Sequence, residues 1–214
     1  MSSVTHILFD FDGTLVDSLE VVVSIVLRHA SASERRYFEE NRNRLKDIGV
    51  RQAMQESGTS SVRLVYLLGC VLYELKTKSH SLQLFDGIEQ VVRALASEYT
   101  LGIVSTNSAR KITQTLKAHD LGSAFSFISS HSSIFGKAER IQKAARENNF
   151  SLNQAVYVGD EDRDVEATKT LGLPMIAVAW GYNSEQRLRE AGADLLALQS
   201  KDILTLVGAL NQES

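Results

Sequence analysis

Two aspartates stand two positions apart directly after a short apolar run. The stretch "ILFDFDGTLVDS" spans residues 7–18 and places Asp10 and Asp12 at the end of a predicted strand. Carboxylates this close repel each other unless a cation neutralises them. Open α/β sheets bind ligands outside the carboxyl ends of their strands. Residues that end the other strands are therefore candidates for the same site as this pair.

Polar residues end or follow three further apolar stretches. They are Ser105, Thr106 and Asn107 at the end of "LGIVS", Lys137 at the helix start after "FSFIS", and Asp160, Glu161 and Asp164 after "AVYVG". Taken singly, each has an ordinary explanation, such as a helix N-cap or an acid that favours a helix dipole. Taken together, at successive strand ends, they predict one site.

The chemistry of that site follows from its residue types. Carboxylates and a backbone carbonyl are the hard oxygen ligands that suit Mg²⁺. A carboxylate beside such an ion stays ionised and can act as a nucleophile. A lysine and a strand-end hydroxyl can hold the oxygens of a phosphoryl group. These are the parts that phosphoryl transfer requires.

Apolar, strand-like stretches alternate with helical patterns along most of the chain. The stretches are 6–9, 101–105, 125–129, 155–159, 175–179 and 194–198, and the helical patterns between them cover 87–99, 108–120, 137–149, 161–172 and 183–192. Apolar strands that alternate with helices favour a parallel sheet covered on both faces. We therefore expect an α/β core with a doubly wound, Rossmann-like parallel sheet, and we assign no element after residue 198.

One region interrupts this alternation. Residues 16–82 contain helical patterns at 17–30, 33–49, 50–58 and 61–76, and no convincing strand. A single crossover helix needs far fewer residues. We expect an inserted all-helical cap domain at 16–82, with a core domain made of 1–15 and 83–214; one long crossover is the alternative.

Composition excludes several classes of protein. The 214 residues include 23 basic and 26 acidic side chains, for a net charge of −3, so no basic excess suggests nucleic-acid binding. The longest apolar run, 21–27, is too short to span a bilayer. Cys70 is the single cysteine, which rules out an internal disulfide. We expect a cytoplasmic enzyme that binds neither nucleic acid nor membrane, as a monomer or a homodimer.

Four stretches in this order resemble the four motifs of the haloacid dehalogenase-like (HAD) hydrolase superfamily. They are "DFDGTLVDS", "VSTN", "FGKAE" and "VGDEDRD", and the closing "AVAWGYNSEQRLREAGADLL" is similar to the phosphoglycolate phosphatase branch. The resemblance covers essentially the whole chain. It implies a Mg²⁺-dependent phosphatase that hydrolyses a small phosphorylated metabolite through an aspartyl-phosphate intermediate.

The resemblance also implies a role for each matching residue. Asp10 matches the nucleophile, and Asp12 matches the acid that protonates the leaving group and then activates water. The family's Mg²⁺ is held by the carboxylates matching Asp10 and Asp160 and by the backbone carbonyl matching Asp12. Asp164 matches an acid that orients metal-bound water or the family lysine.

The phosphate-binding residues follow in the same way. Ser105 best matches the family hydroxyl, with Thr106 as the close alternative and Asn107 in support. Lys137 matches the family lysine, and Lys143 is a weaker match set deeper in the helix.

Two features concern the substrate. Glu161 stands where many phosphoglycolate phosphatases have threonine, so this extra acid is a candidate for an alternative metal ligand or for a residue that orients the ligands. In relatives, a loop between the second and third cap helices selects the leaving group; residues 46–54 match it best, with Gly49 for the turn and Arg51 for an anionic substrate. Arg51 as a solvated helix residue stays open.

Four other functions are alternatives to a phosphatase. Phosphosugar mutases of this fold typically carry "ED" in the fourth motif, where this chain has Gly159 and Asp160. Metal-free dehalogenases lack an acid at the position of Asp12. A phosphonate hydrolase needs a cap lysine, for which Lys46 is the only candidate and the supporting motif is absent. A catalytically silent interaction module is the alternative from a different class.

Overall fold

The computed structural model describes residues 3–77, 82–130 and 136–212. A parallel sheet of six strands forms the centre, in the order β3-β2-β1-β4-β5-β6. The strands are β1 (His6–Phe9), β2 (Thr100–Ser105), β3 (Phe127–Ser130), β4 (Ala155–Gly159), β5 (Met175–Val178) and β6 (Leu195–Ala197). Each overlaps a stretch predicted from sequence, and the doubly wound α/β core is confirmed.

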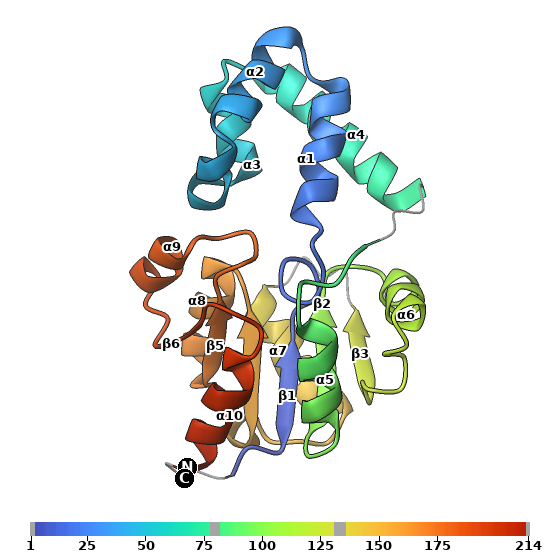
Figure 1. The fold of residues 1–214 in the computed structure, drawn as a ribbon, viewed down its shortest axis with the longest axis vertical. Coiled ribbons are helices and arrows are strands. Elements are labelled where there is room, and N and C mark those ends of the chain that lie inside the picture. The colour runs from blue at the N-terminus through green and yellow to red at the C-terminus, as the bar shows by residue number, and fades with distance from the viewer. Residues whose placement is uncertain (1–2, 78–81, 131–135, 213–214) are drawn as a thin grey trace.

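Helices cover both faces of the sheet (Figure 1). They are α5 (Ile88–Ala96), α6 (Ala109–Ala118), α7 (Lys137–Glu147), α8 (Asp162–Leu171), α9 (Glu185–Glu190) and α10 (Asp202–Gln212), with a short 3₁₀ turn at Leu152–Gln154. Ile7 and Phe9 of β1 pack in one hydrophobic cluster with α5, α6 and α10, while Leu8 packs in another with α7, α8 and α9. Because successive side chains of a strand point to opposite faces and both faces are covered, Ile7, Leu8 and Phe9 of β1 are all apolar.

Between β1 and α5 the chain forms a separate block of helices that lies beyond one end of the sheet (Figure 1). We call residues 19–77 the helical block; it contains α1 (Leu19–His29), α2 (Ala32–Glu40), a 3₁₀ turn (Arg42–Arg44), α3 (Leu45–Glu56) and α4 (Ser61–Thr77). It has its own hydrophobic cluster, to which Ile25, Phe38, Met54 and Leu67 contribute. This arrangement supports our proposal that residues 16–82 form a domain of their own.

The two chain segments that join the block to the sheet run side by side. Asp17 N–H donates to the Gln83 carbonyl at 2.9 Å, and Phe85 N–H donates to the Leu15 carbonyl at 3.1 Å. Val16 and Leu84 form an isolated antiparallel bridge. The block is therefore attached to the core through one paired stem.

Two predictions on the helices need correction. The second helix was expected to run over 33–49, but α2 ends at Glu40, where Asn41 Nδ2 donates back to the Tyr37 carbonyl at 2.9 Å. The helix α10 was not predicted at all, although Ile203 and Val207 of this helix are buried against the sheet. Within the described residues no helix is long and apolar enough to cross a membrane.

Candidate active site

Three buried carboxylates meet at the centre of the sheet edge. Asp10 follows β1, Asp160 follows the neighbouring strand β4, and Asp164 is in the first turn of α8. All are buried, and one carboxylate oxygen from each lies within 4.8 Å of the others. Because β2 and β4 flank β1 on opposite sides, this edge is the switch point at which such folds bind ligands.

Lys137 is the cation that faces these carboxylates. It is the first residue of α7, and its Nζ lies 2.8 Å from Asp10 Oδ2 and 3.0 Å from Asp164 Oδ1. It also lies 5.1 Å from the centre of the Tyr157 ring. Burial lowers the pKa of Lys137, but Asp10 and Asp164 raise it more, so the net shift is upward. The ammonium therefore stays charged in the core.

Asp160 is fixed by neighbours on both sides. Thr14 Oγ1 donates to its Oδ1 at 2.8 Å, and the N–H of Tyr182 donates to its Oδ2 at 2.7 Å. A Cβ on Gly13 would meet Asp160 Oδ2 at 2.1 Å, and one on Gly181 would meet it at 2.2 Å. Two glycines therefore let the backbone close tightly around this carboxylate.

Asp12 has a different hydrogen-bond partner from the three clustered acids. Its Oδ2 accepts from Asn107 Nδ2 at 3.1 Å. Burial and the nearby charge of Asp10 raise the pKa of Asp12, while hydrogen bonds from Ser18 and Asn107 lower it, and the net shift is upward. A raised pKa is what a proton donor near neutral pH requires.

The residues after β2 differ in how they face the site. Ser105 is buried, and its Oγ accepts from the Asn107 N–H at 3.1 Å, whereas Thr106 is exposed. Asn107 is held in turn by Ser130, whose Oγ donates to its carbonyl at 2.5 Å. Asn107 thus connects the end of β2 to Asp12. The sequence predicted Asn107 as a site residue but not this hydrogen bond.

Glu161 lies beside the cluster and opens α8. Its carboxylate forms an ion pair with Arg163. Burial, partly opposed by Arg163, raises the pKa of Glu161 to about 7. It is outside the group of three acids, which leaves its proposed role as a metal ligand or orienting residue a prediction.

The cluster fits a divalent cation. All three carboxylates are buried, and Lys137 Nζ pairs with Asp10 at 2.8 Å and with Asp164 at 3.0 Å, so one ammonium faces three acids. Burial, with the charges of Asp10 and Asp164, raises the pKa of Asp160 well above its usual range. Oxygen donors with an excess of negative charge are the set that Mg²⁺ prefers. The group differs from the sequence prediction, which gave Asp164 only an orienting role and added the backbone of Asp12.

The expected loop at 46–54 is largely helical. It lies in α3, and only Gly49, with φ 74° and ψ 156°, departs from helical geometry. Gly49 therefore kinks the chain, as a residue without Cβ can. The side chain of Arg51 lies outside the described part of the chain. Lys46 Nζ donates to the Trp180 carbonyl at 2.7 Å, so this amine contacts the core.

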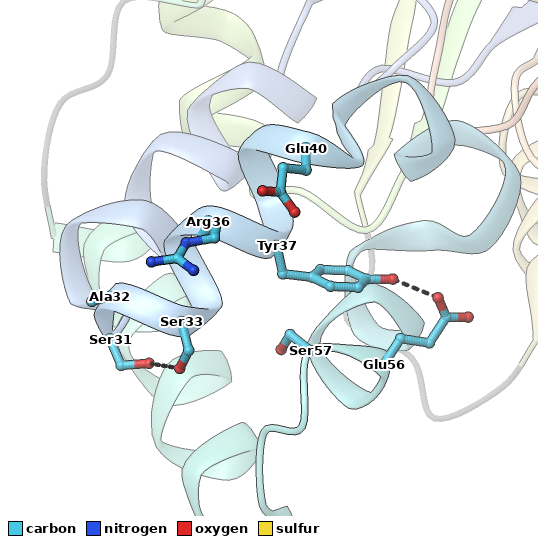
Figure 2. A pocket seen from close by; sticks show the side chains of 8 residues that line it. All are labelled: Ser31, Ala32, Ser33, Arg36, Tyr37, Glu40, Glu56 and Ser57. Atoms are coloured by element: carbon cyan, nitrogen blue, oxygen red, sulfur yellow. Dashed lines mark hydrogen bonds between the residues drawn. The ribbon is translucent and has the colours of Figure 1, made fainter.

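A hollow of about 700 Å³ lies on the helical block, away from these residues. Figure 2 shows its lining from α2 and the end of α3, with Tyr37 bonded to Glu56 across it. None of the predicted site residues lines it. The candidate active site is therefore identified by its converging side chains and not by this hollow.

Four residues that surround Asp160 were not predicted as site residues: Gly13, Thr14, Gly181 and Tyr182. Gly13 and Thr14 lie inside the first motif, directly after Asp12. Gly181 and Tyr182 follow β5, whose carboxyl end adjoins that of β4. Their position after a strand that neighbours β4 is the sequence signal that marks them.

The sequence matches the model of a known family, described as haloacid dehalogenase-like hydrolase, over residues 7–178. A phosphoglycolate phosphatase from Synechococcus elongatus is 35% identical, with 97% of this chain and 99% of that protein aligned. The pyrophosphatase PpaX from Listeria monocytogenes is 26% identical over 95% of this chain and 96% of its own length.

Solved structures share the fold. A haloacid dehalogenase-like family protein from Streptococcus pneumoniae superposes with a TM-score of 0.75 at 23% identity, covering 96% of this chain and 99% of its own. A predicted phosphatase from Clostridium acetobutylicum gives a TM-score of 0.75 at 22% identity over 97% and 100% of the two chains.

Proposed function

Since the chain belongs to the haloacid dehalogenase-like hydrolase family, we propose that it is a Mg²⁺-dependent phosphatase that hydrolyses a small phosphorylated metabolite, with 2-phosphoglycolate as the first candidate. The observation that carries the proposal is the cluster of Asp10, Asp160 and Asp164 around Lys137, with Asp12 beside it. The candidate substrate comes from the relative of highest identity named above. Cytoplasmic location and oligomeric state, monomer or homodimer, stay predictions.

The reaction would proceed in two displacements. A carboxylate oxygen of Asp10 attacks phosphorus, and the bond from phosphorus to the leaving oxygen breaks. Asp12 gives its proton to that oxygen, which departs as an alcohol. Water then attacks the phosphorus of the aspartyl-phosphate, Asp12 takes a proton from this water, and Asp10 is released with inorganic phosphate.

The remaining residues would position and neutralise. Lys137 balances the charge of the phosphoryl oxygens and of Asp10, while Ser105 or Thr106, with Asn107, contacts the phosphoryl group from the β2 end. Mg²⁺, when bound by Asp10, Asp160 and the Asp12 carbonyl, with Asp164 beside them, would supply further charge neutralisation. Thr14 and the Tyr182 N–H hold Asp160 in place for this purpose.

One observation disfavours the mutase alternative. A Cβ on Gly159 would come within 2.6 Å of Asp164 Oδ2 and 2.8 Å of Tyr157 Cε1. A glutamate before Asp160, typical of those mutases, therefore has no room in this arrangement. The presence of an acid at Asp12, which metal-free dehalogenases lack, likewise disfavours dehalogenation.

The test is a hydrolysis screen of the purified chain with and without Mg²⁺. The substrates are 2-phosphoglycolate, pyrophosphate, sugar phosphates, nucleotides and p-nitrophenyl phosphate, and phosphate release is measured. We expect Mg²⁺-dependent hydrolysis that the Asp10→Asn variant lacks. If the folded wild type hydrolyses none of these substrates, the silent interaction module would be supported instead. Transfer of phosphate between substrates without release of inorganic phosphate would support the mutase.

A further inference from the structure

The loop between β5 and α9 contacts the helical block at several points. We call residues 179–184 the β5–α9 loop. Besides the bond from Lys46 Nζ to the Trp180 carbonyl, the Ser184 N–H donates to the Lys46 carbonyl at 3.1 Å. In Figure 1, α3 lies above α9 and this loop. Block and core therefore meet here, away from the stem that joins them covalently.

Arg187 in α9 adds a contact that reaches both sides. Its Nη1 donates to the Asp47 carbonyl of the block at 3.0 Å. Its Nε and Nη2 donate to Asp162 Oδ2 at 2.8 and 2.6 Å. One guanidinium thus joins the start of α3 to the first turn of α8.

On the core side of this bridge, the partner Asp162 belongs to the fourth motif. Asp162 lies two residues after Asp160, and its N–H donates to Asn183 Oδ1 at 2.8 Å. The Asn183 N–H in turn donates to the Asp160 carbonyl at 3.3 Å. The block side lies next to Gly49, whose non-helical backbone turns the chain at this point.

The chemistry of the side chain suits a bridge. A guanidinium is a rigid planar fork with several donors, and it can hold a carboxylate and a carbonyl at the same time. Lysine is a point charge on a flexible stem, and its ammonium would serve one of these partners well but not both at these positions. Both Arg187 and Asp162 are about one-third exposed, so solvent weakens the pair without removing it.

We propose that Arg187 is a positioning residue, which holds the start of α3 over the catalytic edge by bridging the Asp47 carbonyl and Asp162. This inference rests on the proposed function. In the proposed mechanism the motif residues contact the phosphoryl group, which leaves recognition of the leaving group to the helical block. Esters that depend on the block should therefore need Arg187, and p-nitrophenyl phosphate should need it much less.

The experiment compares three variants of the full chain. Arg187→Ala removes both contacts, and Arg187→Lys keeps the charge that pairs with Asp162. Arg189→Ala is the matched control, because Arg189 is in the same helix and pairs with Glu185 within that helix. Steady-state kinetics use 2-phosphoglycolate, or the best metabolite from the screen, beside p-nitrophenyl phosphate.

We expect both Arg187 variants to lower kcat/KM for the metabolite by about 10-fold, mainly through KM, as loss of a charge-assisted hydrogen bond predicts. Their kcat/KM for p-nitrophenyl phosphate should stay within about 2-fold of wild type, and Arg189→Ala should change neither. An equal loss for both esters, or a metabolite KM restored by Arg187→Lys, would overturn the bridging role.

A second readout does not need activity. Hydrogen exchange of residues 45–50 and 180–184 should be faster in Arg187→Ala than in wild type and unchanged in Arg189→Ala. Wild-type exchange in Arg187→Ala would overturn the contact itself. Failure of the proposed function is distinguishable, because the wild type would then hydrolyse no ester whatever the exchange rates.

Discussion

Asp12 has to hold a proton before it can give one to a leaving group. Its surroundings favour this, since burial and the charge of Asp10 raise its pKa, and Asn107 fixes the orientation of the carboxyl group. Asp10 is bound differently, with its Oδ1 accepting from the Phe11 N–H at 2.8 Å and its Oδ2 facing Lys137. Two aspartates two positions apart thus have different partners, which is the physical basis for giving them different tasks.

Replacing Asp12 by asparagine tests this division. The amide can keep the bond to Asn107 but cannot transfer a proton, so kcat should fall by about 100-fold or more. Mg²⁺ affinity, measured by calorimetry, should stay near the wild-type value, because the three clustered carboxylates remain. Asp10→Asn is the contrasting variant and should lose both. Impaired Mg²⁺ binding with normal turnover at saturating Mg²⁺ would reverse the roles of the two residues.

Gly181 gives a second prediction at this scale. A Cβ there would meet Asp160 Oδ2 at 2.2 Å and the Gly13 carbonyl at 2.4 Å, so Gly181→Ala has to displace the carboxylate or the backbone. We expect Mg²⁺ affinity and kcat to fall at least 10-fold and stability to fall by about 1–3 kcal/mol. The control is Gly208→Ala in α10, where a Cβ meets nothing within 4 Å. Wild-type Mg²⁺ affinity in Gly181→Ala would contradict the close packing.

At the scale of elements, the strands were more predictable than the helices. A buried parallel strand such as β4 is apolar at every position and is bounded by polar residues, so its limits at Ala155 and Gly159 were predicted correctly. The break between α2 and α3 was not. It depends on the Asn41 side chain bonding to the Tyr37 carbonyl, and a local contact of this kind leaves no periodic pattern.

Some residues of the site were likewise predictable from the sequence and others were not. Asp10, Asp160 and Lys137 stand at element ends, so the alternation of strands and helices predicted that they would lie together. Tyr182 contributes its backbone N–H to Asp160, and a backbone donor can come from any residue type. Its participation depends on how the β5–α9 loop packs, which sequence alone did not reveal.

The start of α2 offers a prediction about stability. Glu34 accepts from the Ser31 N–H at 2.7 Å and from Thr59 Oγ1 at 2.9 Å, and it pairs with Arg63. Burial alone would raise the pKa of Glu34, but these hydrogen bonds lower it to about 2. Since the folded pKa is below the unfolded value of 4.5, the carboxylate stabilises the fold above pH 4.5, and this is lost as pH falls toward 2.

Glu34→Gln should therefore lower the free energy of unfolding by roughly 1.5–3 kcal/mol at pH 7. The difference from wild type should shrink steadily below about pH 4. Urea unfolding across this pH range measures it, with Glu39→Gln on the exposed face of α2 as the control. An equal loss at pH 7 and pH 2.5 would mean that packing, and not the charge of Glu34, accounts for the effect.

At the scale of the whole molecule, we expect the acidic cluster to oppose folding unless a divalent metal ion joins Lys137 in neutralising it. Asp10 is far in sequence from Asp160 and Asp164, and folding brings one carboxylate oxygen of each to within 4.8 Å of the others. Burial raises the pKa of Asp160 and, against the opposing effect of Lys137, that of Asp164. A carboxyl whose folded pKa exceeds its unfolded value binds protons more tightly in the folded state. Its contribution to stability therefore declines as pH rises through that range.

Removal of divalent metal should expose this opposition. In EDTA the melting temperature should decrease as the pH is raised from 5.5 to 8. Added Mg²⁺ should raise the melting temperature most at pH 8, where protons compete least with the ion for the carboxylates. At 100 times its dissociation constant the ion contributes about 2.7 kcal/mol, or several degrees for a chain of this size.

Ca²⁺ should stabilise as well but support little hydrolysis, because it takes more ligands at longer distances and can occupy both oxygens of Asp10. Asp160→Asn, which removes one charge of the cluster, should flatten the pH dependence in EDTA and abolish most of the Mg²⁺ effect. Melting curves that are the same with EDTA and with Mg²⁺ at pH 8, in a wild type that hydrolyses phosphate esters in EDTA, would refute the cluster as a metal site.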